Sequence, residues 1–202
     1  MKKMFLDIET IPAGEDKHDI LRLVHAQKIK DKKKVPETFE EFLEYTNFDG
    51  SFGRIACISY ALNNEKPKTL FGDEKKMLQD FWKEAKDVDL FVGFNVMDFD
   101  LRFIYQRSII FNVQPSRELP FIKNTKTPIY DVMYEWSKWG VVQKISLDLL
   151  AKALGIPSSK DGEVIAKTVW DAFKKGKIQQ ICEYCQRDVE VTRAIYKRME
   201  FT

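Results

Sequence analysis

Residues 4–10 read MFLDIET, a stretch that combines the pattern of a buried strand with two acids. Asp7 and Glu9 are two residues apart, so on a strand their side chains point to the same face, while the apolar residues fill the core. Two neighbouring carboxylates repel each other and cost stability unless a cation joins them. The stretch alone therefore leaves two interpretations open, a partly exposed strand with a solvated acidic face or a cation site.

The length and composition of the chain predict one soluble globular domain. It has 202 residues, of which 44% are hydrophobic and 32% are charged, and these values are ordinary for a globular protein. No apolar run approaches the roughly 18 residues of a membrane span, so no membrane association is expected. The first residues, MKKMFLD, become acidic too early for a secretory signal, which predicts a cytoplasmic protein. The net charge is only +2, so any affinity for nucleic acid must come from local patches.

The three cysteines favour the same compartment, because a small odd number is a poor disulfide framework. Cys182 and Cys185 form a C-x-x-C pair. No second pair of Cys or His lies near it in the sequence, so no zinc site is expected there.

The hydrophobic pattern predicts strands in the first half of the chain and helices in the second. Strands are predicted at 4–8, 54–62, 68–71 and 90–94, and a strand leading into a helix at 128–133. Helices are predicted at 73–87, from about 98 to 109, and at 146–156, 163–176 and 177–199. Asp73 and Ser146 are the expected caps, and Gly155 and Gly176 the expected stops. This order predicts an α/β domain with a mixed sheet covered by helices.

Residues 12–53 separate the first two predicted strands and are polar and lysine-rich, with the run KIKDKKK at 28–34. Helical periodicity is weak at 17–28 and clearer at 36–45. We interpret the segment as an insertion with one or two helices. It is either a solvated loop or a basic flap that follows a nucleic-acid backbone.

Two further motifs place polar residues where active sites are usually built. Within GFNVMDFD (93–100), a predicted strand ends just before Asn95, and Asp100 follows in the first turn of the next helix. Open α/β sheets place their sites at the carboxyl ends of strands, although an acid at a helix start also complements the helix dipole. In YCQRD (184–188), Tyr184 and Asp188 share one helix face, although a surface Asp beside a half-buried Tyr has the same spacing.

Together the motifs resemble those of the 3′-5′ exonucleases that use four acids and a tyrosine, in the DnaQ-like branch of the RNase H-like superfamily. The matching order is Asp7-x-Glu9, Asn95-x3-Phe99-Asp100 and Tyr184-x3-Asp188. The form GFNVMDFDLRFI looks closest to the exonuclease domain of family B DNA polymerases, and the chain is similar to stand-alone bacterial relatives of that domain.

A second subtype of these exonucleases has His five residues before the last Asp. Here that position is Glu183, and the only histidines are His18 and His25. The resemblance therefore favours the tyrosine subtype. Asp98 departs from the pattern, because it adds an acid beside the second motif where the family usually has a neutral residue.

The resemblance implies an RNase H-like fold, with a mixed five-stranded sheet flanked by helices, and a chemistry that uses two divalent ions, Mg²⁺ or Mn²⁺. Asp7 would bridge both ions, Glu9 and Asp188 would hold the ion that carries the attacking water, and Asp100 would act on the second ion. Tyr184 would hydrogen-bond that water. Asn95 would help to position the strand or the second motif. Thr10, Asn95 and Phe99 are the implied contacts with substrate.

The expected activity is removal of nucleotides from the 3′ end of single-stranded nucleic acid, with release of nucleoside 5′-monophosphates. DNA is favoured over RNA, although contacts with a 2′-OH cannot be located from the sequence. The motifs nearly exhaust the chain, so no polymerase region is expected, and proofreading would require a polymerase or repair partner.

Two alternatives remain at this stage. One is a catalytically silent nucleic-acid-binding module of the same fold, against which the full set of acids argues. The other is a different two-metal nuclease, such as an RNase H-type endonuclease, which the Tyr-x3-Asp motif disfavours.

Overall fold

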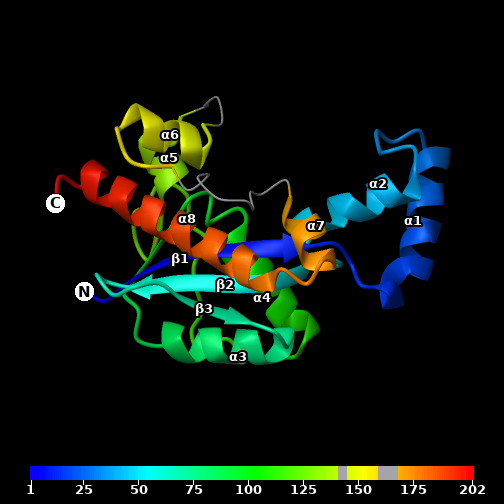
Figure 1. The fold of residues 1–202 in the computed structure, drawn as a ribbon, viewed down its shortest axis with the longest axis horizontal. Coiled ribbons are helices and arrows are strands. Elements are labelled where there is room, and N and C mark those ends of the chain that lie inside the picture. The colour runs from blue at the N-terminus through cyan, green and yellow to red at the C-terminus, as the bar shows by residue number, and fades with distance from the viewer. Residues whose placement is uncertain (141–144, 159–167) are drawn as a thin grey trace.

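Five strands form one mixed sheet in the computed structural model, which describes residues 1–140, 145–158 and 168–202 (Figure 1). The spatial order is β3-β2-β1-β4-β5. The central strand β1 pairs antiparallel with β2 and parallel with β4, while β3 is antiparallel to β2 and β5 is parallel to β4. The strands are β1 (Lys3–Ile11), β2 (Arg54–Leu62), β3 (Lys68–Phe71), β4 (Leu90–Gly93) and β5 (Ile129–Asp131). The predicted α/β fold with a mixed five-stranded sheet flanked by helices is confirmed, in a single domain.

The side chains of β1 alternate between two cores, one on each face of the sheet. Met4, Leu6 and Ile8 pack in the core beneath α3 (Glu74–Ala85) and α4 (Asp100–Ile110). Phe5 points to the other face, where α8 (Ile178–Met199) crosses the sheet (Figure 1). Because side chains alternate along a strand, Asp7 and Glu9 lie on the Phe5 face, beneath α8.

The pairing of β1 with β2 shifts directly after Glu9. Glu9 pairs with Cys57, whereas Thr10 pairs with Ile55, so β2 carries one extra residue at this point. A bulge of this kind increases the local twist and redirects neighbouring side chains, and it is common beside active sites.

The remaining helices largely follow the predicted caps and stops. Asp73 accepts a hydrogen bond from the Lys76 N–H at the start of α3, and Ser146 caps α6 (Leu147–Ala153). Gly155 and Gly176 adopt positive φ after their helices, as the stop signals require. Two short helices complete this half, α5 (Val132–Trp136), which follows β5 directly, and α7 (Val169–Lys174). The predicted helix at 163–176 corresponds to α7, and its first part, residues 163–167, lies outside the described residues. None of the described helices is long and apolar enough to span a membrane.

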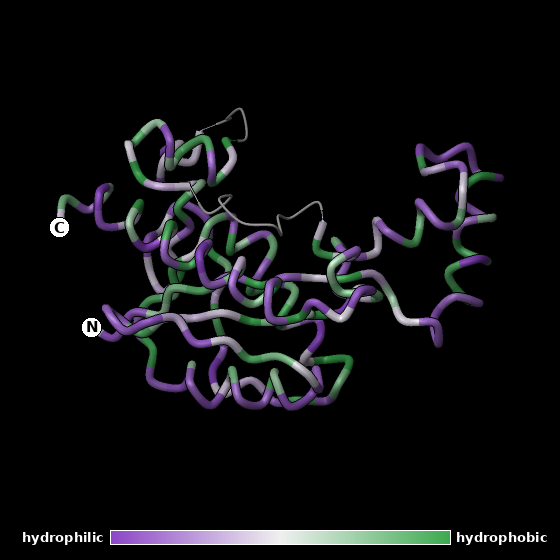
Figure 2. The backbone as a smooth tube through the Cα atoms, in the orientation of Figure 1, coloured by the Kyte–Doolittle hydropathy of each residue, from purple (hydrophilic) through white to green (hydrophobic). Residues whose placement is uncertain are grey.

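Residues 12–53, which we call the arm, project from one end of the sheet (Figure 1). The arm contains α1 (His18–Lys30), α2 (Phe39–Glu44) and two 3-10 helices, Glu15–Lys17 and Tyr45–Phe48. It has a small core of its own, in which the His25 ring stacks on Phe42 at a centroid distance of 4.7 Å. Figure 2 shows the arm as mostly hydrophilic with short hydrophobic stretches, which fits a small core surrounded by charged side chains.

Candidate active site

Strand β1 and helix α8 bring the first and third sequence motifs together. Asp7 and Glu9 point from β1 toward the helix, and one ligand atom from each lies within 4.8 Å of the other and of Cys185 Sγ. The Cys185 thiol is 3.2 Å from Asp7 Oδ2 and 3.3 Å from the Asp7 carbonyl oxygen. Because Asp188 is one turn beyond Tyr184 on α8, both side chains reach the same region, and besides burial the nearby Asp188 carboxylate helps to raise the pKa of the Tyr184 hydroxyl.

The second motif reaches the site because the chain turns sharply after β4. A Cβ on Gly93 would lie 2.5 Å from Val96 Cβ and 3.1 Å from the Leu6 carbonyl oxygen, so only glycine allows this close approach. Asp100 then begins α4, and its Oδ1 accepts a hydrogen bond of 3.0 Å from the Ile8 N–H. The carboxylate of Asp100 is therefore attached to the backbone of β1 between Asp7 and Glu9.

A fully buried carboxylate, Asp131, holds this turn in place. Its two oxygens accept hydrogen bonds from the N–H groups of Asn95 and Met97, at 3.1 and 3.0 Å. The same side chain caps α5 by accepting from the N–H groups of Met133 and Tyr134. Asn95 adopts a φ of 59°, a conformation that Asn tolerates better than most residues. One side chain thus fixes both the end of β4 and the loop that leads to Asp100.

The carboxyl groups of Asp7, Glu9, Asp100 and Asp131 have pKa values above the ordinary range. Burial is the largest cause of the raised pKa at Asp7 and Glu9, and the charges of Cys185, Asp188 and Asp100 raise both further. Burial also raises the pKa of Asp100 to about 7, although backbone hydrogen bonds to its carboxylate oppose the rise. The pKa of Asp131 rises to about 6, again through burial. Without a cation, these carboxyl groups therefore stay protonated to a higher pH than ordinary carboxyl groups do, toward neutral pH.

Tyr184 remains a neutral phenol at any physiological pH. Burial raises the pKa of its hydroxyl, and the negative charges of Asp188 and Glu9 raise it further. Its O–H group is therefore available as a hydrogen-bond donor beside the carboxylates.

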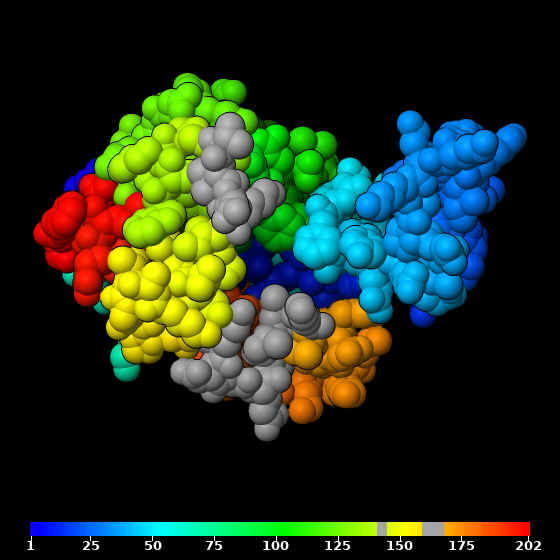
Figure 3. Space-filling view, turned by 90° about the horizontal axis from the view of Figure 1, so that it is seen from above, coloured from blue at the N-terminus to red at the C-terminus, as the bar shows by residue number. Residues whose placement is uncertain are grey.

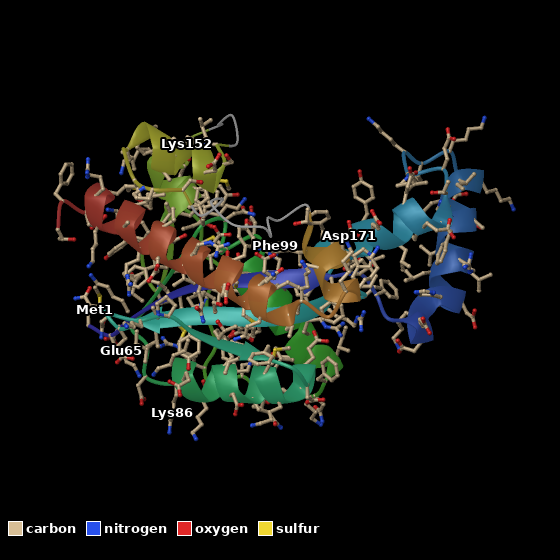
Figure 4. The ribbon with its side chains drawn as sticks, viewed as in Figure 1. Met1, Glu65, Lys86, Phe99, Lys152 and Asp171 are labelled. Atoms are coloured by element: carbon tan, nitrogen blue, oxygen red, sulfur yellow. The ribbon has the colours of Figure 1, made fainter. Side chains whose placement is uncertain are left out.

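These groups line one cavity of about 420 Å³. Figure 3 shows it from above as a hollow with β1 on its floor, bordered by the arm on one side and by α7 on another. Asp7, Glu9, Asp100, Tyr184 and Asp188 all contribute to the lining. The walls add four phenylalanine and tryptophan side chains, Phe48 of the arm, Phe94 after β4, Phe99 before α4 and Trp170 of α7. Figure 4 shows Phe99 near the middle of the molecule, above the sheet.

The donor atoms of the cavity suit a hard divalent cation. The described residues that line it include several carboxylates and no Lys, Arg or His. Clustered carboxylate oxygens are the ligands that Mg²⁺ and Mn²⁺ prefer. A divalent ion would lower the pKa values of the surrounding carboxyls, because an opposite charge favours their ionised form.

The structure distributes the other sequence candidates around the cavity. Thr10 lines it, but the Thr10 hydroxyl donates to the Asn47 carbonyl oxygen at 2.8 Å. Phe99 lines it with its ring 6.4 Å from that of Phe48. Asn95 lies outside the lining and shapes the second motif through its backbone. Asp98 also lies outside the lining and accepts a hydrogen bond from the Tyr134 hydroxyl, so its side chain points elsewhere.

Asp131 and Cys185 are parts of the site that the sequence motifs did not single out. In the sequence, Asp131 stands between a predicted strand and a predicted helix, at a position where a helix cap is expected. Cys185 sits inside YCQRD, but only the fold reveals that it lies against Asp7. All three cysteines are buried free thiols, and the neighbouring Cys182 and Cys185 thiols, together with burial, raise the pKa of the Cys57 thiol of β2.

Comparisons with known proteins agree with this architecture. A DNA polymerase of Archaeoglobus fulgidus is 24% identical over 211 residues, which cover 92% of this chain and 26% of the polymerase. The structure of the family B DNA polymerase from Pyrobaculum calidifontis superposes with a TM-score of 0.67 at 13% identity, over 99% of this chain and 24% of that one. The chain thus spans about a quarter of the length of each polymerase, and the second likeness supports the fold alone.

Residues 46–202 match a family described as "Predicted 3'-5' exonuclease related to the exonuclease domain of PolB". The matched range contains the second and third motifs, with Asp100, Tyr184 and Asp188, while Asp7 and Glu9 precede it. Because the range covers well over half of the chain, the protein belongs to this family of predicted 3′-5′ exonucleases related to the PolB exonuclease domain.

Proposed function

We propose that this protein is a metal-dependent 3′-5′ exonuclease of the four-acid-plus-tyrosine type, which shortens single-stranded nucleic acid and releases nucleoside 5′-monophosphates. The observation that carries the proposal is the convergence of Asp7, Glu9, Asp100, Tyr184 and Asp188 on one cavity from three separate parts of the chain. DNA is the favoured substrate, because the relatives named above are DNA polymerases.

The four carboxylates would hold two divalent cations, Mg²⁺ or Mn²⁺. When bound, such ions lower the pKa of a water molecule and stabilise the negative charge on the leaving 3′-oxygen. Asp7, at the centre of the cluster, is the proposed shared ligand, with Glu9 and Asp188 on the side of the attacking water and Asp100 on the other. The hydrogen bond from the Ile8 N–H fixes the orientation of the Asp100 carboxylate, which reduces the reorganisation that ligand binding requires.

Tyr184 is the proposed positioning group for the attacking water. Its raised pKa keeps the hydroxyl protonated, so the phenol cannot accept the proton of the water but can hold the molecule by a hydrogen bond. The helical spacing between Tyr184 and Asp188 puts this hydroxyl beside the carboxylate that would bind the same ion.

The test is incubation of 5′-labelled single strands of DNA and RNA with Mg²⁺ or Mn²⁺. A 3′-5′ exonuclease gives a ladder that shortens from the 3′ end, whereas an endonuclease gives internal cuts and a silent binding module gives none. Asp100→Asn should lower the rate by orders of magnitude. Asp98→Asn is the matched control, because Asp98 lies two residues away but outside the cavity lining. Full activity in excess EDTA, or in an Asp7→Asn protein, would refute the proposal.

A further inference from the structure

The arm concentrates positive charge at its outer end. The five lysines there are all exposed, at the end of α1 and in the turn that follows: Lys28, Lys30, Lys32, Lys33 and Lys34. Within the described part of the chain, none of the five forms an ion pair with a carboxylate. Their mutual repulsion is offset most effectively by a polyanion.

A groove leads from two of these lysines toward the catalytic cavity. A groove of about 860 Å³ between α1 and α2 is lined by Lys28, Lys34 and Tyr45. Glu44 lines both the groove and the catalytic cavity, so the two hollows adjoin. Figure 3 shows the arm beside the hollow that has β1 on its floor. Glu41, Glu44 and Asp49 also line the groove, so a polyanion would follow its lysine edge.

Two exposed aromatic rings lie at the junction. Tyr45 and Phe48 are 63% and 66% exposed, and their ring centroids are 6.4 Å apart. Core phenylalanines such as Phe81 and Phe91 are fully buried. Rings left in solvent beside a groove with lysines along its edge are typical of single-strand binding surfaces, because every base has a face on which an aromatic ring can stack.

The junction is attached firmly to the catalytic strand. The Thr10 hydroxyl, next to Glu9, donates to the Asn47 carbonyl oxygen at 2.8 Å. The Thr46 hydroxyl accepts from the Ala13 N–H at 2.9 Å. At the other end of the arm, the buried Arg107 guanidinium donates to the Gly50 carbonyl oxygen. A surface fixed in this way loses little conformational entropy when a ligand binds.

We infer that the arm is a second substrate-binding surface, which holds the part of a single-stranded nucleic acid that lies upstream of the 3′ end. The lysines contact its phosphates, and Tyr45 and Phe48 contact its bases between the groove and the cavity. The inference rests on the proposed function and extends it, because it makes binding depend on the length of the strand. The chemistry of hydrolysis stays in the cavity and does not involve the lysines.

The test compares oligonucleotides of about 4 and about 12 nucleotides, lengths that span the usual range of single-strand sites. The natural protein should bind the longer strand more tightly, as measured by fluorescence anisotropy in EDTA, and should show a lower KM for it in Mg²⁺. Replacement of the five lysines by Gln should remove this advantage and reduce the slope of log Kd against log salt by up to about 3.5, since each phosphate contact contributes about 0.7. The kcat for the shorter strand should not change.

The control removes the same charge elsewhere, from the exposed lysines on the side of the molecule that carries β3 and α3, namely Lys66, Lys68, Lys75, Lys83 and Lys86. This variant should still bind the longer strand more tightly than the shorter one. That result would show that the position of the lysines matters and not only the net charge. If the natural protein cuts both strands but its affinity is the same for the two lengths, or if the arm variant keeps the advantage, the inference is wrong while the proposed function stands. If neither strand is cut by the natural protein, the proposed function fails first.

Discussion

Asp100→Asn should stabilise the metal-free protein, although it should abolish catalysis. The substitution removes a charge from the cluster but keeps Oδ1, which accepts the hydrogen bond from the Ile8 N–H. Asp100 is only 3% exposed, and burial raises its pKa from 3.8 to about 7. The folded state therefore keeps the proton to higher pH than the unfolded state does, and stability is lost as pH rises from about 4 to about 7.

The expected magnitude follows from that difference in pKa. One pKa unit corresponds to about 1.4 kcal/mol, so ionisation of Asp100 lowers the free energy of unfolding by about 4 kcal/mol at most. About 3 kcal/mol of this falls between pH 5 and pH 8, because part of the loss has already occurred at pH 5. Asp100→Asn cannot ionise, so the difference in stability between variant and natural protein should widen by this amount across the interval.

Urea unfolding in EDTA at pH 5 and pH 8 measures the difference. Asp87→Asn, at an exposed position, is the control and should leave the pH dependence of the natural protein unchanged. Adding Mg²⁺ at about 100 times its Kd should raise the free energy of unfolding of the natural protein by about 2.7 kcal/mol, and that of Asp100→Asn by less. If the difference in free energy of unfolding between Asp100→Asn and the natural protein stays constant from pH 5 to pH 8, burial does not raise the pKa of Asp100 and the reasoning is refuted.

Three further predictions concern residues that position the site. Tyr184→Phe keeps the ring and deletes the hydroxyl, so the single-turnover rate should fall about 10²-fold with little change in Tm; an intact rate would reduce Tyr184 to a packing residue. Asp131→Ala removes the acceptor for four backbone N–H groups and should lower the free energy of unfolding by roughly 2–4 kcal/mol. Urea unfolding measures this loss, and an effect below about 0.5 kcal/mol would contradict the role of Asp131 at the turn. Arg107→Met removes the cation that pairs with the largely buried Glu74 carboxylate and should cost up to roughly 3–5 kcal/mol; the double variant with Glu74→Gln should recover part of that loss in the same assay.

The fold could be predicted from sequence wherever one residue pattern determined both local structure and burial. The strands at 54–62 and 68–71 were predicted with the bounds that the structure gives, because their apolar runs end at turn residues. The caps Asp73 and Ser146 were predicted because a side-chain oxygen at a helix start has one clear use. The arm was predicted less completely, since its packing depends on contacts such as the stacking of His25 on Phe42, which no local pattern specifies.

The candidate site was predictable to the extent that its motifs carry fixed spacings. Asp7 and Glu9 on a strand, and Tyr184 and Asp188 on a helix, each share a face through elementary geometry. Neither spacing predicts that the strand and the helix meet. That depends on the alternation along β1, which sends Phe5 into the core under α8 and leaves the two acids on the same side.

Helix α8 links the stability of the fold to the geometry of the site. Its second half packs Val189, Ile195 and Tyr196 into the core with Phe5, while its first half carries Tyr184 and Asp188 to the carboxylates of β1. A helix is stiff over one or two turns, so the apolar contacts that hold its second half also set the position of Asp188. The repulsion among the acids acts against this packing in the metal-free protein, and a bound cation would relieve it. Cation binding should therefore tighten the contact between α8 and the sheet. The packing of the core residues of α8 would then depend on whether the site holds a cation.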